Sequence, residues 1–185
     1  ILQKPFPIPD TADVAYVYDG LMYLGAEAAM ETVDLIASRL PEKALGEAGF
    51  RHILDGVSRP QPCAGIDLHP APKIFKETCE ICWQQPSKKI YDFIRGLSPY
   101  PGAWSVLHAV EGEEGKAIPI KIFKTAGTDR KSLAPGGMLI VERNRLYVST
   151  ADRLLELLDV QLAGKRRMDV KAFLNGFKDI DGYRF

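Results

Sequence analysis

The chain is poor in cysteine, with three in 185 residues, and this scarcity excludes a fold held together by several disulfides. An odd and small number of cysteines is typical of a protein from a reducing compartment. Cys79 and Cys82 form a single C-x-x-C pair, but a structural zinc site needs four ligands. Neither Cys63 nor any histidine is suitably spaced to complete the set. We therefore expect no metal, and we expect two partly buried thiols beside Trp83.

Long hydrophobic runs and common catalytic motifs are also missing. No apolar run approaches the ~20 residues of a membrane-spanning helix, and the chain does not begin with a signal-peptide pattern. We expect a cytoplasmic monomer with no membrane partner. The sequence contains no P-loop, no G-x-S-x-G, no G-x-G-x-x-G and no H-E-x-x-H, and its histidines are isolated. The first residue is Ile1 and not methionine, as expected for a fragment or a processed product.

Charge is balanced overall but unevenly distributed along the chain. Residues 1–70 hold 5 basic and 10 acidic side chains, whereas residues 71–185 hold 19 basic and 14 acidic ones. An acidic first part and a basic second part indicate two units with different roles. A basic unit is suited to meet a phosphate backbone even in a neutral chain. The alternative is that this modest surplus of cations only covers an ordinary solvated surface.

The first part is predicted to contain a strand followed by helices. Residues 1–9 alternate apolar and polar side chains, and their three prolines cannot donate to a sheet, which predicts an edge strand. Apolar residues at helical spacing predict one long helix, or two in series, over 14–39 and a short helix over 44–54. Prolines and glycines are then dense over 57–72, which indicates an extended linker and a domain boundary.

The second part is predicted to be a small β-barrel that follows one helix. Ile90, Phe93, Ile94 and Leu97 lie on one helical face, and Pro99 ends that helix. Turn residues then separate short strands, expected over 103–110, 117–124, 138–142, 146–150 and 154–162. This spacing is typical of a small barrel or sandwich, and an OB-like barrel is the natural choice. Asp169 is expected to cap a last helix over 170–177.

Cations recur in this second part, and they are the strongest functional feature of the residues alone. The candidates for phosphate contact are Lys73, Lys76, Arg95, Lys121, Lys165, Arg166 and Arg167. If these side chains face one way, each can neutralise a phosphate and release counterions. Tyr100 and Phe75 have rings suited to stack on a base, but we expect core packing for both. If Trp104 lies in the core of the barrel, its replacement by alanine should destabilise the barrel by a few kcal/mol.

Several segments, taken in order, resemble methionyl-tRNA formyltransferases. The sequence YDGLMYLGAE at 18–27 resembles the helix pair that ends the family's catalytic domain. Residues 71–74 resemble its interdomain linker, and IRGLSPYPGAW at 94–104 resembles the opening of its C-terminal domain. The sequence LAGKRRM at 162–168 resembles its closing basic loop. At 80–83 the chain has Glu-Ile-Cys-Trp where the family usually has a run similar to Arg-Ile-Asp-Trp.

The resemblance implies an α+β chain in three parts. Residues 1–56 would be the end of the α/β formyltransferase domain, a strand plus helices. Residues 57–72 would be the linker, and residues 73–185 an OB-like β-barrel domain that binds tRNA. The family transfers a formyl group from 10-formyltetrahydrofolate to the amino group of methionyl initiator tRNA. Its catalytic residues precede the region found here, so the resemblance implies a tRNA-positioning portion without a catalytic residue of its own.

Only tRNA contacts transfer to this chain through the resemblance. Lys73 and Lys76 match basic positions of the family's linker, and residues 165–167 match its basic loop. Two alternatives stay open. One is the formyl-transfer or hydrolase region of a formyltetrahydrofolate dehydrogenase-like enzyme, which carries similar IRG and PGAW-like runs but is less favoured by the basic loop. The other is a non-catalytic β-rich interaction module with no RNA partner.

Overall fold

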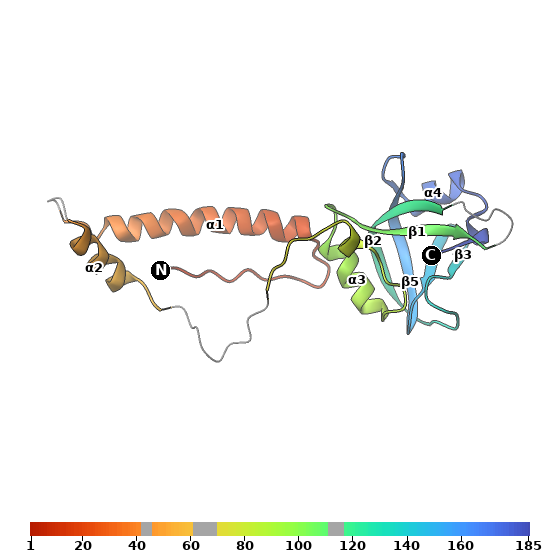
Figure 1. Cartoon of the computed structure of the whole chain (residues 1–185), viewed down its shortest axis with the longest axis horizontal. Coiled ribbons are helices and arrows are strands. Elements are labelled where there is room, and N and C mark those ends of the chain that lie inside the picture. The colour runs from red at the N-terminus through yellow and green to blue at the C-terminus, as the bar shows by residue number, and fades with distance from the viewer. Residues whose placement is uncertain (42–45, 61–69, 111–116) are drawn as a thin grey trace. The chain divides into compact units, whose positions relative to one another are not determined.

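A computed structural model shows how the chain folds (Figure 1). The residues it describes are 1–41, 46–60, 70–110 and 117–185. The chain divides into two compact units, of which the first comprises residues 1–10 and 16–72 and the second residues 11–15 and 73–185. Our division into a catalytic-domain remnant, a linker and a C-terminal domain stays a prediction, since most of the predicted linker lies outside the described residues.

The first unit is helical. It contains most of α1 (Val14–Ala37), one continuous helix, and all of α2 (Glu47–Val57), which begins later than the sequence indicated. The edge strand expected over 1–9 is absent, so that prediction was wrong. These residues run along α1 instead, where Lys4 forms ion pairs with Glu27 and Glu31 (Figure 1). A helix has no free edge to complete a ladder of backbone hydrogen bonds, so the segment stays extended without becoming a strand.

The second unit is built on one nearly closed antiparallel sheet. Its strands are β1 (Ala103–Ala109), β2 (Ala117–Lys131), β3 (Leu139–Glu142), β4 (Arg145–Ser149), β5 (Arg153–Leu162), β6 (Met168–Asp169) and β7 (Tyr183–Arg184). The order is β3-β4-β5-β2-β1-β7, and β6 pairs with β5. A bridge between Met138 and Arg184 joins the two ends of this order, which makes the sheet barrel-like. The mixed α and β composition is therefore confirmed, whereas the OB assignment remains a prediction.

The expected strands all form, but one is longer than predicted and two further short strands are present. The strand predicted over 117–124 continues to Lys131, and the two-residue strands β6 and β7 were not foreseen. The extension of β2 contains register shifts against β5 at Ile122/Lys124, Lys124/Thr125 and Gly127/Lys131. A shift by one residue moves the following side chains to the other face of the sheet. The buried positions change accordingly from Ile120 and Ile122 to Phe123 and Thr125, so the simple alternation that identifies a strand is lost.

Four short helical elements complete the second unit. They are η1 (Glu77–Cys79), α3 (Ser87–Gly96), α4 (Val170–Gly176) and η2 (Ile180–Gly182). The predicted cap of α4 is confirmed, since Asp169 Oδ1 accepts a hydrogen bond from the Ala172 amide at 2.8 Å. The apolar face of α3 lies against the sheet and buries Ile90 and Ile94 (Figure 1). None of the helices among the described residues is long and apolar enough to cross a membrane.

Of the two tryptophans, Trp83 lies in the core of the second unit. Trp83 is 3% exposed, its Nε1 donates to Ser105 Oγ at 3.0 Å, and its ring stacks on Phe185. Trp104 is only partly buried at the edge of the core. The two thiols differ from expectation, because Cys79 is fully buried while Cys82 is exposed. Residues 80–83 pair with β1 through a bridge from Glu80, which alternates the burial of their side chains.

Candidate nucleic-acid interface

A groove of about 630 Å³ is lined by segments that lie far apart in the sequence. We call it the aromatic–lysine groove. It is lined by Ile74, Phe75, Lys76, Cys79, Tyr100, Pro101, Gly102, Trp104, Pro119, Ile120, Lys121, Gln161, Leu162, Ala163 and Gly164. These residues come from the segment that leads into η1 and from η1 itself, from the turn after α3, from the strands β1, β2 and β5, and from the loop after β5. All of them belong to the second unit.

One wall of the groove is the segment that leads into η1. The Phe75 amide donates to Thr78 Oγ1 at 3.1 Å, and that hydroxyl donates back to the Phe75 carbonyl at 2.7 Å. The Lys76 carbonyl accepts hydrogen bonds from Trp104 Nε1 at 2.7 Å and from the Cys79 amide at 3.0 Å. The backbone of this wall is therefore fixed, although the Phe75 side chain is 54% exposed.

Another part of the lining is the turn between α3 and β1. The Gly102 amide donates to the Leu97 carbonyl at 2.8 Å, and Lys121 Nζ donates to the Pro101 carbonyl at 2.8 Å. Gly102 has φ +84°, and a Cβ there would lie 3.2 Å from the Phe123 ring. Only glycine adopts this conformation at little cost, and its lack of a side chain lets the turn approach β2. The turn presents Tyr100 with 83% of its surface exposed.

The floor of the groove is apolar and belongs to the sheet. Trp104 of β1, Pro119 and Ile120 of β2, and Leu162 of β5 contribute to it. Antiparallel pairing places these strands side by side, since Ile120 pairs with both Ser105 and Leu162. The sheet thus assembles, from three distant parts of the sequence, a surface that no local pattern predicts.

The basic loop predicted at 162–168 begins in the groove, which its first three residues line. The Lys165 carbonyl accepts a hydrogen bond from Gln161 Nε2 at 2.8 Å, and its amide donates to the Leu162 carbonyl at 3.0 Å. Lys165 and Arg166 are exposed, and within the described parts of the chain neither side chain forms an ion pair. Both are therefore free to meet a phosphate.

The other predicted cations differ in how firmly they are held. Lys73 Nζ lies 5.4 Å from the centre of the Phe75 ring, and Lys76 Nζ lies 5.9 Å from that of Trp104. Arg167 pairs with Asp159 at 2.6 Å and lies over the Phe123 ring. Cations over ring faces keep their charge available to a further anion, whereas a close carboxylate offsets it. Arg167 thus has a structural contact besides any role in binding.

Arg95 lies on α3 and does not line the groove; of the predicted cations, Lys76 and Lys121 do. Its Nε donates to Asp92 Oδ1 at 2.7 Å, and its Nη1 donates to the Ala12 carbonyl at 2.8 Å. Partial burial would raise the pKa of Asp92, but hydrogen bonds from Lys88 and Arg95 together lower it below its ordinary value. Arg95 is therefore anchored in the structure on the side of α3.

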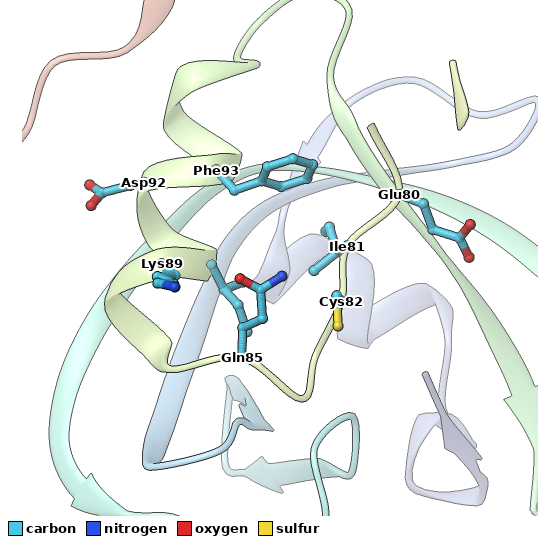
Figure 2. A pocket seen from close by; sticks show the side chains of 8 residues that line it. Glu80, Ile81, Cys82, Gln85, Lys89, Asp92 and Phe93 are labelled. Carbon is cyan, nitrogen blue, oxygen red and sulfur yellow. The ribbon is translucent and has the colours of Figure 1, made fainter. Parts of the chain in front are cut away.

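A second, smaller cavity of about 360 Å³ lies between α3 and the segment 80–85 (Figure 2). Its charged lining residues are Glu80, Lys89 and Asp92. Two carboxylates and one amine do not favour a polyphosphate, which needs a surplus of cations. Among the described residues there is also no group of three or more histidine, cysteine or carboxylate side chains able to hold a metal ion.

For two groove residues, Tyr100 and Phe75, the predicted burial was wrong. We expected both in the core, and the structure exposes both at the rim of the groove. A signal was present for Tyr100, which stands between Pro99 and Pro101. Such a tight turn lies at the surface and has no inward-facing position for a large side chain.

Comparisons with known proteins identify relatives of the whole chain. A profile described as "Formyl transferase, C-terminal domain" matches residues 73–178. The methionyl-tRNA formyltransferase of Parabacteroides distasonis is 41% identical over 184 residues, which cover 99% of this chain and 52% of that protein. The corresponding protein of Bacteroides fragilis is 40% identical over 189 residues, covering 100% and 52%. The chain thus spans about half the length of these relatives.

A solved structure shares the fold at low sequence identity. HypX from Aquifex aeolicus, in complex with tetrahydrofolic acid, matches with a TM-score of 0.52 and 18% identity, covering 93% of this chain and 26% of that one. At this identity the similarity concerns the fold alone.

Proposed function

The chain belongs to the formyl transferase C-terminal domain family, and on that basis we propose that it is the C-terminal portion of a methionyl-tRNA formyltransferase. The full-length protein would transfer a formyl group from 10-formyltetrahydrofolate to the amino group of methionyl initiator tRNA, in the cytoplasm. The portion described here would hold the tRNA. The identity to methionyl-tRNA formyltransferases over the whole chain supports this reading over a formyltetrahydrofolate dehydrogenase-like enzyme.

The observation that carries the proposal is that cations from distant segments line one groove or lie next to it. Lys76, from the segment before η1, and Lys121, from β2, line the groove, and Lys165 follows the lining residue Gly164. The charged residues that line the groove are both lysines. Contacts of this kind supply affinity and fix the position of a nucleic acid, and they do not depend on its sequence.

Formyl transfer itself belongs, in this proposal, to the part of the relatives that this chain does not match. Of the three histidines, His52 and His108 lie in the described residues, and they are in different units. The folate complex of HypX supports a folate-type cosubstrate for the full-length protein. We therefore assign tRNA holding, and not the reaction with folate, to the residues that line the groove.

A salt titration tests the proposal directly. The 185-residue chain is titrated with initiator tRNA at several salt concentrations, and the logarithm of the association constant is plotted against the logarithm of salt. Each phosphate contact contributes roughly −0.7 to −0.9 to the slope, so three or more cations predict a slope of about −2 or steeper. Binding that does not change with salt, or no binding at low salt, would contradict the proposal.

A further inference from the structure

We infer that the aromatic–lysine groove holds an unpaired nucleotide of the tRNA, with its base against Tyr100 and its phosphate near Lys121. This inference rests on the proposed function and adds what the groove recognises. Holding a tRNA by its phosphates needs only surface cations. The groove has in addition an apolar floor and two exposed aromatic rings, which phosphate contacts do not use.

The exposed rings are the first observation. Tyr100 is 83% exposed and Phe75 is 54% exposed, and both line the same groove. Exposure of an aromatic ring costs about 25 cal/mol for each Å² of apolar surface left in water. Both rings stand on backbone that hydrogen bonds already fix, at Gly102 and at Thr78. A rigid aromatic surface loses little entropy when a flat ligand stacks on it.

The placement of the lysines selects an anionic aromatic ligand. Lys121 Nζ donates to the Pro101 carbonyl next to Tyr100, and an ammonium group has three donors, so it retains two for a phosphate. Lys76, next to Phe75 in the chain, also lines the groove, with its Nζ 5.9 Å from the centre of the Trp104 ring. The cavity volume of about 630 Å³ falls in the usual range for sites of small ligands. A nucleotide combines the flat ring and the anion that this arrangement fits.

The groove fits an unpaired nucleotide and not a base pair. In a duplex the faces of each base are covered by its neighbours, so Tyr100 would have no face to stack on. Proteins that read RNA through aromatic rings do so at loops, bulges and ends, where bases are unstacked. Stacking on a ring tolerates any base, so we expect preference for single strands and little preference among sequences.

The test uses the 185-residue chain and three RNA probes. They are a short single-stranded oligoribonucleotide, the same strand annealed into a blunt duplex, and the initiator tRNA. Trp104 lies in the floor of the groove, so its fluorescence reports occupancy. We expect the single strand to change this fluorescence and to bind at least roughly ten times more tightly than the duplex. Equal affinity for the two, at equal salt, would overturn the inference.

Substitution of Tyr100 supplies the second arm. Tyr100→Ala should weaken binding of the single strand and of the tRNA by roughly 5- to 100-fold, as loss of one stacking contact does. Tyr100→Phe keeps the ring and should bind as the wild type does. Tyr18→Ala is the matched control, because Tyr18 is 68% exposed but lies in the first unit. If Tyr100→Ala binds both RNAs within twofold of the wild type, the inference is wrong.

The same measurements separate the inference from the proposed function. If the tRNA binds with a steep salt dependence but Tyr100→Ala has no effect, the inference fails and tRNA holding stands. If the single strand binds through Tyr100 but the tRNA does not bind, the nucleotide site stands and the proposed function fails. If Tyr100→Phe loses as much affinity as Tyr100→Ala, the hydroxyl and not the ring makes the contact, and stacking is excluded.

Discussion

Two neighbouring glycines, Gly136 and Gly137, allow the sheet of the second unit to close. A Cβ on Gly136 would lie 2.4 Å from the carbonyl oxygen of Trp83, and Gly137 has φ +94°. The Gly137 carbonyl also accepts a hydrogen bond from the Phe185 amide at 2.9 Å, and Phe185 stacks on Trp83. The absence of side chains at these two positions therefore lets the two ends of the sheet meet over the buried tryptophan.

Gly136→Ala should destabilise the protein, because the new methyl group meets backbone that cannot rotate away. We expect a loss of about 1–3 kcal/mol in the free energy of unfolding, measured by denaturant titration followed by fluorescence. Gly127→Ala is the control, since a Cβ there has nothing within 4 Å. The control should leave stability unchanged or raise it slightly. Equal effects of the two substitutions would show that the approach to Trp83 is not limiting.

Single residues show where the sequence alone was informative and where it was not. The cap formed by Asp169 was predicted correctly, because its signal lies within three residues. The burial of Trp83 and the partial exposure of Trp104 were not predicted. The residues next to each tryptophan in the sequence do not show which of the two side chains faces the core. Which of two tryptophans enters the core depends on the pairing of Glu80 with β1, and this pairing is a tertiary contact.

At the scale of elements, the start of α3 is secured by a residue far away in the sequence. Ser87 begins α3, and its amide donates to Asp152 Oδ1 at 2.7 Å, across 65 positions. Asp152 also accepts a hydrogen bond from Thr150 Oγ1 at 3.0 Å, and the Ala151 amide donates to the Gln85 carbonyl at 3.1 Å. The turn between β4 and β5 therefore caps the helix that leads into the Tyr100 turn.

This cap predicts a stability that depends on pH. The hydrogen bond from the Ser87 amide, the largest cause, holds the pKa of Asp152 below its ordinary value. A lowered pKa means that the charged carboxylate stabilises the fold, and that this stabilisation is present above pH ~4 and lost as pH falls through the folded-state pKa. Asp152→Ala should cost about 1 kcal/mol at pH 7, as loss of a helix cap does.

Asp152→Asn is the informative partner of that substitution, because it keeps an oxygen acceptor but does not titrate. Its deficit in unfolding free energy relative to the wild type should be largest at neutral pH and should shrink below pH ~4. Asp55→Asn, at an exposed position of α2, controls for the general effect of removing a carboxylate. A deficit that is the same at pH 7 and at pH 3 would show that charge on Asp152 does not support the fold.

The helices and strands could be predicted from the sequence where one local pattern of apolar and turn residues extends over the whole element. The strands β1, β3, β4 and β5 were found because turn residues bound each of them and their apolar residues face the core. The second half of β2 was missed, since its register shifts against β5 break the alternation after Phe123. The edge strand expected at the start of the chain was wrong, because a strand needs a partner and α1 provides none.

At the scale of the whole molecule, the uneven distribution of charge is the sequence feature closest to the proposed function. The surplus of cations after residue 70 could be counted without a structure, and so could the basic run at 165–167. What could not be counted is which of those cations share a surface. That information lies in the order β5-β2-β1, which sets Lys121 between the turn that carries Tyr100 and the strand that leads into the basic loop.

The effect of removing cations on tRNA binding depends either on where those cations lie or only on the net charge of the chain, and the two explanations predict different results. If placement matters, the double substitution Lys165→Ala and Arg166→Ala should weaken binding and make the salt slope shallower by roughly one to two, since two phosphate contacts are lost. The charge-matched control is Lys171→Ala with Lys178→Ala, because both side chains are exposed and lie outside the basic loop that follows the groove residue Gly164. All four positions are exposed, so unfolding midpoints should change little and binding losses can be compared directly.

The comparison of the two double variants decides whether the groove side is the tRNA-holding surface. Equal changes in the salt slope would mean that the RNA responds only to net charge, and the convergence of cations on one groove would then have no role in binding. A change confined to the Lys165 and Arg166 variant would place the RNA beside Gly164. Arg167→Ala belongs to neither pair: since Arg167 also pairs with Asp159 and lies over Phe123, we expect it to lower stability as well as affinity.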